Sequence, residues 1–240
     1  MARLNDDRVD PNKVLKLAGL FYDAVLDQSQ WPKALDQLEC EVEAIHALWA
    51  GGMIVPDGFF TFFEESTDGP RAREALSQHM HNPWSENVPY PANGGIYLPG
   101  DDVDLSEIKS TSFYKDVLQR YGAEEALNWV VAGSTPSHAT ILGLLFPSRD
   151  SALSASKTVA ALGPHLNRVY QLMRSLWFAQ TQSSLSQAAL DRLSCGVVHV
   201  DASLSVLSVN RAAIALTRQS NAAAAILDNR FLLLDRWFQE

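Results

Sequence analysis

The sequence predicts an α+β protein in which four or five antiparallel strands are flanked by helices, and in which a long helix and a shorter C-terminal segment follow. Three observations predict this class. Two amphipathic helical patterns open the chain, short apolar strands follow in two pairs, and residues 156–193 then carry a helical pattern. Groups of helices and groups of strands in this order are typical of an α+β fold.

Composition sets limits on what the chain can be. It has 240 residues, of which 47% are hydrophobic, so it can bury a core of one large domain or one and a half typical ones. The net charge of −9 argues against a nucleic-acid surface, which needs clustered Lys and Arg. No apolar run reaches 18 residues and the N-terminus is polar, so we expect a cytoplasmic protein without membrane segments. Cys40 and Cys195 are expected to be small buried residues.

The first two elements are predicted to form a helical hairpin. Asp10 is placed to cap the first helix, with Pro11 at its first position. Its apolar face is Val14, Leu17, Phe21 and Val25, widened by Tyr22 and Leu26. The second helix starts at residues 29–32 and presents Leu35, Leu38, Val42 and Ile45.

A β-hairpin follows, with strands at 47–55 and 59–63 around the turn 56–58. A helix is expected to start at Gly69 and Pro70 and to run through Met80. Residues 82–100 form the longest irregular stretch, rich in proline and aromatic residues, which is typical of a lid or pocket wall.

The rest of this region is predicted as short helices at 105–109 and 112–121 and as strands at 127–132 and 140–146. The complete order is that of sensor domains of the GAF/PAS sort, whose sheets hold a small-molecule cavity under a lid.

Residues 156–193 are predicted to form one connecting helix of about 57 Å. Pro164 is tolerable if it lies in the first turn, with residues 161–163 outside the helix. The alternative is two shorter core helices broken at Gly163 and Pro164. Apolar residues at heptad spacing predict a dimer contact along this helix: Leu162, Leu166, Val169, Met173 and Leu176.

After this helix the pattern changes to strands at 196–201 and 205–210 and a helix at 211–217 capped by Asn210. Residues 222–225 are interpreted as a short helical run and residues 232–234 as a further strand. The predicted division is therefore a sensor domain at 1–155, a connecting helix at 156–193 and a partial segment at 194–240.

Short motifs carry a family resemblance. FYDAVLD at 21–27, followed by WPKAL at 31–35, resembles the opening of a group of LuxR-type helix-turn-helix regulators. Further motifs of the same group would be NPW at 82–84, SFYKD at 112–116 and LGPHL at 162–166. GVVHVD at 196–201, with NRAA at 210–213, resembles the start of a PAS-like domain. The similarity covers most of the chain.

The resemblance implies a GAF-like sensor region coupled to a C-terminal DNA-binding domain. No pair of helices with basic recognition residues precedes Glu240, so these residues are not expected to bind DNA directly. The PAS-like segment is also shorter than such a domain. The sequence leaves two interpretations open: a shortened form of a longer regulator, and a regulator that acts only by pairing.

Site candidates favour binding over catalysis. His79 and His81 point apart on a helix, so neither a metal nor another cofactor is expected. His165 is assigned to local packing or hydrogen bonding. No catalytic motif is present, so the chain is not expected to be an enzyme. The predicted ligand pocket consists of aromatic residues, which could instead be ordinary core: Trp84, Tyr90, Tyr97, Phe113, Tyr114 and Trp129.

The sequence therefore predicts the sensory part of a LuxR-like regulator, which binds a small apolar or aromatic molecule and signals as a homodimer through the connecting helix. The alternative is a ligand-free module for dimerisation or protein interaction. An enzyme on a GAF-like fold is a third, unsupported interpretation.

Overall fold

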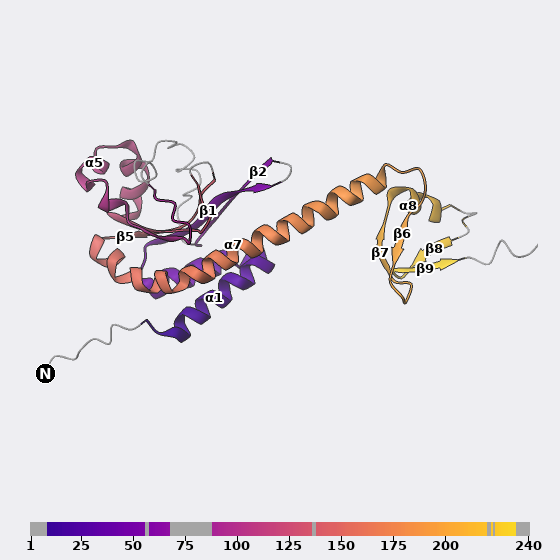
Figure 1. Ribbon diagram of the computed structural model, residues 1–240, viewed down its shortest axis with the longest axis horizontal. Helices are drawn as coiled ribbons and strands as arrows, with labels where there is room; N and C mark the ends of the chain where they lie inside the picture. The colour runs from indigo at the N-terminus through magenta and orange to yellow at the C-terminus, as the bar shows by residue number, and fades with distance from the viewer. Residues whose placement is uncertain are drawn as a thin grey trace, which may run out of the picture. The chain divides into compact units, whose positions relative to one another are not determined.

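The computed structural model describes residues 9–55, 58–67, 88–135, 138–219, 222 and 224–233. The chain divides into two compact units, unit 1 (Met1–Arg174) and unit 2 (Ser175–Glu240). Figure 1 shows the helices and strands of each unit along the chain. No helix within the described ranges is long and apolar enough to cross a membrane.

Unit 1 opens with the predicted helical hairpin, α1 (Pro11–Leu26), a short turn η1 (Gln28–Gln30) and α2 (Trp31–Val42). Asp10 caps α1 as predicted, because its Oδ1 accepts from the backbone N–H of Asn12 at 2.9 Å. Two expectations are wrong. Leu26 is 80% exposed at the last position of α1. Ile45 lies beyond α2, which ends at Val42 and is capped by Glu43 with a left-handed φ of 55°.

The sheet of unit 1 has five antiparallel strands in the order β2-β1-β5-β4-β3. The two predicted strand pairs are confirmed, and the α+β class with them. β3 was not predicted, because its three residues lie in the stretch expected to be irregular. The strands are β1 (His46–Val55), β2 (Gly58–Glu65), β3 (Gly95–Tyr97), β4 (Glu125–Val130) and β5 (Thr140–Phe146).

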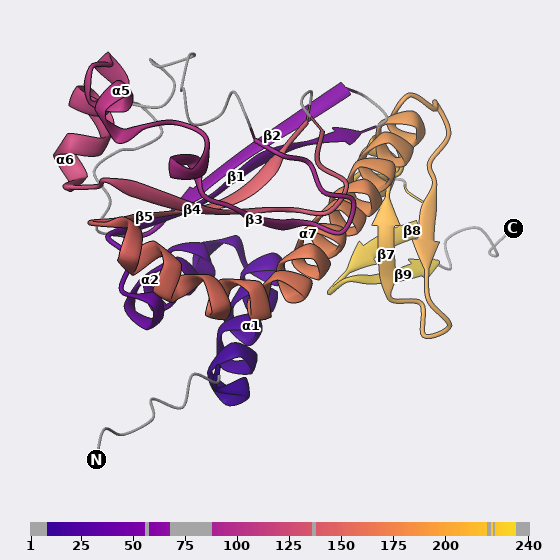
Figure 2. The same ribbon diagram turned by 60° about the vertical axis from the view of Figure 1, so that its left-hand side comes forward.

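One face of the sheet is covered by α1, α2 and the first part of α7 (Arg149–Asp191), as Figure 2 shows. The largest hydrophobic cluster lies in this layer. Trp49 of β1 stacks on Trp31 of α2 with ring centroids 5.8 Å apart, and Phe21 of α1 contacts Trp31 edge-on at 5.9 Å. These aromatic residues join the two N-terminal helices to the sheet.

The other face carries short helical elements. Because successive side chains of a strand point to opposite faces, the strand residues divide between this face and the helix-side core. In β4, Leu127 and Trp129 belong to the helix-side core, whereas Ala126 packs with the short helices. The predicted short helices at 105–109 and 112–121 are confirmed, and the second is helical from Ser112 to Tyr121 with a π-helical part at Tyr114–Leu118. The elements are η2 (Pro99–Asp101), α5 (Leu105–Lys109), η3 (Tyr114–Leu118) and α6 (Gln119–Tyr121).

The long helix is confirmed and the broken alternative is wrong, since α7 runs for 43 residues through Gly163 and Pro164. It starts earlier than predicted, so Pro164 is in the interior and not in the first turn. An interior proline removes one helical hydrogen bond. Pro164 lies on the exposed side of α7, where water can reach the backbone carbonyl that lacks its donor.

Most of the predicted dimer seam is part of the core of unit 1. Leu162, Leu166 and Val169 are fully buried in the helix-side cluster, and Met173 is half-buried against it. Leu176 alone of the five is exposed, at 39%. The spacing of 3 and 4 residues did not distinguish a dimer contact from a core contact within one chain. A helix that packs on a sheet repeats its apolar residues in the same way as a helix that packs on a partner helix.

Unit 2 contains two small antiparallel pairs and a helix: β6 (Val198–Val200), β7 (Val206–Val209), α8 (Arg211–Thr217), β8 (Ala224–Leu227) and β9 (Arg230–Leu233). Asn210 caps α8 as predicted, accepting from the backbone N–H of Ala213 at 2.9 Å. The expected helical run at 222–225 is wrong. Ala224 begins β8, and Asp228 and Asn229, both with positive φ, make the tight turn into β9.

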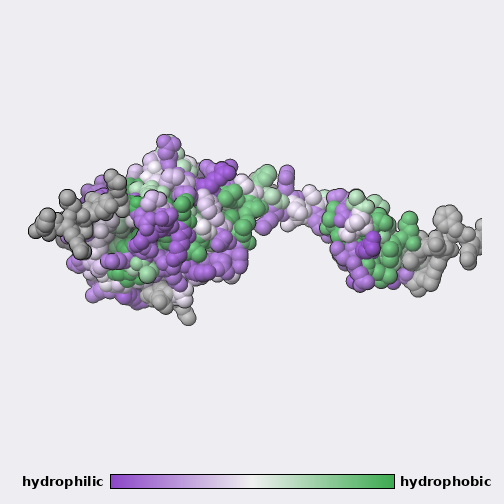
Figure 3. All heavy atoms as spheres, turned by 90° about the horizontal axis from the view of Figure 1, so that it is seen from below, coloured by the Kyte–Doolittle hydropathy of each residue, from purple (hydrophilic) through white to green (hydrophobic). Residues whose placement is uncertain are grey.

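The surface departs from expectation at the cysteines and along α7. Cys40 and Cys195 are both exposed free thiols, so the prediction that they are buried is wrong. The part of α7 beyond Arg174 exposes Leu176, Phe178 and Leu185 among polar residues. Figure 3 colours the residues by hydropathy and shows hydrophobic and hydrophilic residues mixed on the face of unit 1 that it presents.

Candidate functional site

A cavity of about 310 Å³ lies in unit 1 against the sheet face opposite the long helix. This volume is at the lower end of the range of about 300–1,000 Å³ typical of small-molecule sites. None of the described residues at its wall other than His46 can carry a charge below pH 9. The wall includes His46, Leu48 and Ala50 of β1, Ala126 and Asn128 of β4, Ile141, Gly143 and Leu145 of β5, and Val88, Phe113, Val117, Leu118 and Tyr121.

The cavity exists because small residues occupy the sheet beneath it. Ala126, Gly143 and Ala50 all line this space. A Cβ at Gly143 would come within 3.2 Å of Oδ1 of Asn128 and 3.3 Å of the Leu48 side chain. A larger residue at this position would therefore reduce the space available to a ligand.

The structure separates the predicted pocket aromatics. Phe113 lines the cavity. Trp129 faces the opposite side of the sheet and donates from Nε1 to Oδ1 of Asn167 at 3.2 Å. Tyr97 is buried with Tyr90 packed against its cluster, and Tyr114 packs on the cluster of the short helices. Trp84, like His79 and His81, lies outside the described residues.

Sequence reasoning missed the polar part of the wall, namely His46, Asn128 and Tyr121. One signal was available. Ala126 and Asn128 of β4 both line the cavity, so the alternation of this strand would have placed Trp129 on the other face. The position of Tyr121 depends on the fold of the short helices and had no comparable signal.

His46 is the buried titratable group of the site. Its side chain is 1% exposed, and its Nδ1 lies 3.0 Å from Oγ of Ser66 and 3.7 Å from Oε1 of Glu39. Its ring stacks on Tyr121 with centroids 4.9 Å apart. Among the residues that the structure describes, Nε2 of His46 has no hydrogen-bond partner.

Burial sets the protonation states here. Removal from water lowers the pKa of His46 to about 4, so the imidazole is neutral at pH 7. Burial, with the negative charges of Glu65 and Glu39, raises the pKa of Tyr121 to about 12. A neutral ring pair and an apolar wall favour uncharged ligands.

Ser66, His46 and Glu39 do not form a catalytic relay. A nucleophile and a carboxylate must face opposite nitrogens of the imidazole, so that one gives a proton while the other orients the ring. Here both lie at Nδ1. The arrangement can fix the ring, and it cannot pass a proton from serine to histidine to carboxylate. In the described part of the chain, no cluster of His, Cys, Asp or Glu is suited to hold a metal ion.

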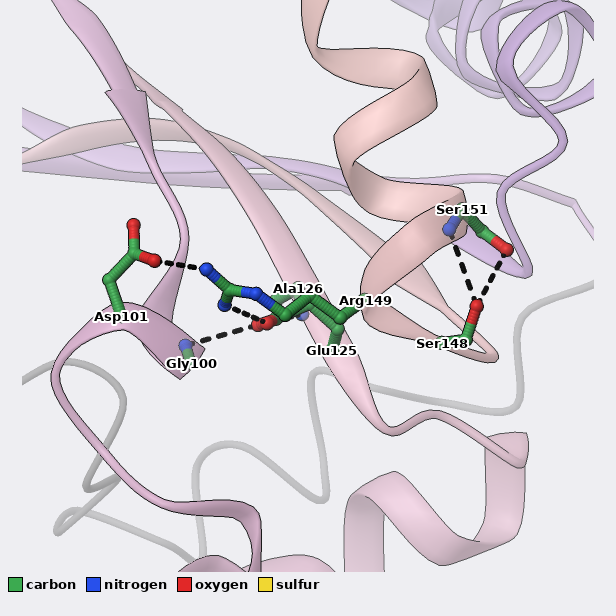
Figure 4. Close-up of polar contacts among 7 residues, drawn as sticks. All are labelled: Gly100, Asp101, Glu125, Ala126, Ser148, Arg149 and Ser151. Carbon is green, nitrogen blue, oxygen red and sulfur yellow. Dashed lines mark hydrogen bonds and ion pairs between the residues drawn. The ribbon is translucent and has the colours of Figure 1, made fainter.

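Polar contacts join the β3 segment (residues 93–101) to α7 at two places. At one end, Arg149 of α7 pairs with Asp101 and with Oε2 of the buried Glu125 at 3.0 Å, and Oε1 of Glu125 accepts from the N–H of Gly100 at 3.1 Å (Figure 4). This cluster ties the end of the segment to the first turn of α7.

At the other end, Asn167 of α7 donates to the carbonyl of Asn93 at 2.9 Å and accepts from the N–H of Ala132 at 3.0 Å. His165 of α7 meets the Tyr22 hydroxyl of α1 at 3.2 Å, which confirms its expected packing and hydrogen-bonding role. A displacement of the β3 segment would therefore act on α7 through Arg149 and Asn167 together.

Comparisons with known proteins add little beyond this geometry. No family model matches the chain and no curated protein matches it. The chain is similar to the solved structure of the VqsR LBD domain from Pseudomonas aeruginosa, with 16% identity over 68% of this chain and 96% of that chain and a TM-score of 0.46. That degree of likeness leaves the family of this chain open.

Proposed function

We propose that unit 1 is a small-molecule sensor domain, that it binds an apolar or aromatic ligand in the cavity, and that it belongs to a LuxR-like transcriptional regulator. The observation that supports this most directly is the cavity itself. It is lined almost wholly by apolar residues, it lies between an antiparallel sheet and short helices, and it has His46 and Asn128 as polar groups. The LuxR-like family assignment rests on the sequence motifs alone.

The proposed signal passes through the β3 segment. Val88 borders the cavity and packs in one cluster with Tyr97 of β3. A ligand that displaces Val88 would shift β3, and the contacts of Arg149 and Asn167 would transmit the shift to α7. The GAF-like sensor, the connecting helix and the PAS-like segment are, in this proposal, the parts through which the signal runs.

A thermal-shift screen of small apolar and aromatic compounds tests the proposal. A ligand at about 100 times its Kd adds about 2.7 kcal/mol to the stability of the folded state. For a unit of this size that raises Tm by about 5–10 °C. Ala50→Phe, which fills the cavity, should abolish the shift, and Ala160→Phe on the exposed side of α7 should keep it. A ligand that still shifts Tm in Ala50→Phe would bind elsewhere, and an empty screen would count against ligand binding.

The second candidate function is a ligand-free dimerisation or interaction module. The exposed Leu176, Phe178 and Leu185 on the part of α7 beyond Arg174 favour it. Light scattering separates the two. The interaction module requires a dimer that Leu176→Asp with Leu185→Asp abolishes, whereas the sensor still binds its ligand as a monomer.

A further inference from the structure

His46 presents one satisfied and one unsatisfied nitrogen at the wall of the cavity. Ser66 meets Nδ1, and no described residue meets Nε2, although the side chain is 99% removed from solvent. A buried polar atom without a partner costs about 1–3 kcal/mol, so proteins retain few of them. Because His46 lines an apolar cavity, this atom is a ready partner for a ligand group that reaches the ring.

The surroundings of the ring determine which tautomer it adopts. Oε1 of Glu39 lies 3.7 Å from Nδ1 and is held there by the N–H of Ala47, which donates to it at 2.6 Å. A carboxylate this close favours the tautomer with the proton on Nδ1, which donates to Oγ of Ser66. Nε2 is then unprotonated, so it can accept a hydrogen bond and cannot donate one.

The charge of the site disfavours anions. Around the ring lie Glu39 from α2, Ser66 after β2 and Tyr121 from α6, and none of them carries a positive charge. No described residue at the cavity wall is Lys or Arg. An anion would be desolvated there without a partner, next to a glutamate.

We propose that the cavity selects an uncharged, mainly apolar molecule with one hydroxyl or N–H donor, and that this donor bonds to Nε2 of His46. This inference rests on the proposed small-molecule function and specifies its ligand class. The ligand donates and the protein accepts, so a phenol or an alcohol fits, and an ether, a ketone or a carboxylate of the same shape does not.

Four probes of matched size test the inference by calorimetry at pH 7.5: 4-propylphenol, 4-propylanisole, butylbenzene and 4-propylbenzoate. We expect 4-propylphenol to bind about 10-fold more tightly than the ether and the hydrocarbon, which corresponds to about 1.4 kcal/mol. The benzoate should bind most weakly. If the ether equals or exceeds the phenol while butylbenzene binds, the inference fails and the proposed function stands. If no probe binds, both fail.

Two variants identify the acceptor. In His46→Phe, which preserves ring shape, the advantage of the phenol should disappear while butylbenzene still binds. In Asn128→Leu, which removes another polar side chain of the wall, the advantage should remain. The reverse pattern would assign the hydrogen bond to Asn128 and overturn the inference.

Nitrogen NMR of the wild-type chain gives a measurement that does not depend on the folding of a variant. The His46 ring should show a protonated Nδ1 and an unprotonated Nε2, and 4-propylphenol should shift the Nε2 resonance. A protonated Nε2 in the free protein would contradict the assignment of an acceptor.

Discussion

Single residues decide how closely α7 approaches the sheet. A Cβ at Gly163 would lie 2.2 Å from Cη2 of Trp129, so the helix packs here only because residue 163 has no side chain. Gly163 is therefore not a helix breaker in this chain. It is the site at which a helix backbone contacts an indole ring whose Nε1 bonds to Asn167 of the same helix.

We expect Gly163→Ala to destabilise unit 1 by about 1–3 kcal/mol, because the added methyl group forces Trp129 or α7 to move. Gly19→Ala is the matched control. It is also a glycine within a helix, but no atom lies within 4 Å of its would-be Cβ, so it should be neutral or stabilising by up to about 1 kcal/mol. Urea denaturation measures both. Equal effects of the two changes would mean that helix propensity and not packing matters at Gly163.

His46 predicts a pH dependence of stability. Its pKa is about 4 in the folded chain and about 6.5 in the unfolded chain, so the unfolded state takes up the proton first as pH falls. The stability that the neutral ring contributes is complete above pH 6.5 and is lost between pH 6.5 and 4, by up to about 3 kcal/mol. The His46→Gln variant should lose less stability than the wild type between pH 6.5 and 4, as measured by urea denaturation at each pH. Parallel curves for wild type and variant would contradict the buried neutral ring.

At the scale of elements, the sequence predicted the helices and strands better than their partners. The caps Asp10 and Asn210 are local signals that placed α1 and α8, and apolar runs on either side of turn residues placed the two strand pairs. The seam at Leu162, Leu166 and Val169 was assigned to a second chain because periodicity shows that one face is apolar and does not show what covers it.

The site was predicted less well for the same reason. An aromatic residue in a strand belongs to one of two faces, and Trp129 belongs to the face without the cavity. The cavity depends on the small size of Gly143, Ala126 and Ala50. A search of the sequence for large aromatic residues therefore does not find it. Phe113 does line the cavity, because the short helix to which it belongs packs on that face.

The link between α7 and the β3 segment gives a prediction at this scale. Arg149→Met should destabilise unit 1 by about 1–3 kcal/mol, because it leaves the buried carboxylate of Glu125 with fewer partners. Hydrogen exchange should increase at residues 95–101. The control Arg168→Met, on the exposed face of the same helix, should change neither the stability of unit 1 nor the hydrogen exchange of residues 95–101. Adding Glu125→Gln to Arg149→Met should recover part of the loss, and a purely additive double variant would show that the pair is not coupled.

For the whole molecule, the buried and the exposed parts of α7 predict different outcomes for the same kind of substitution. Leu166→Asp should unfold unit 1, since it places a charge in the core. Leu176→Asp with Leu185→Asp should leave the fold intact and reduce self-association, if the chain dimerises through exposed α7. Circular dichroism and light scattering on both variants measure this. A folded Leu166→Asp would contradict the burial of this position.

The central claim for the molecule is that the space beneath the short helices is a ligand site. Methyl NMR during titration with 4-propylphenol tests this most directly. The account predicts that the methyl signals of Ile141 and Leu145, which line the cavity, shift and saturate together, while those of Leu15, 60% exposed on α1, stay in place. Unchanged Ile141 and Leu145 signals, or shifts confined to exposed methyl groups such as Leu15, would contradict it.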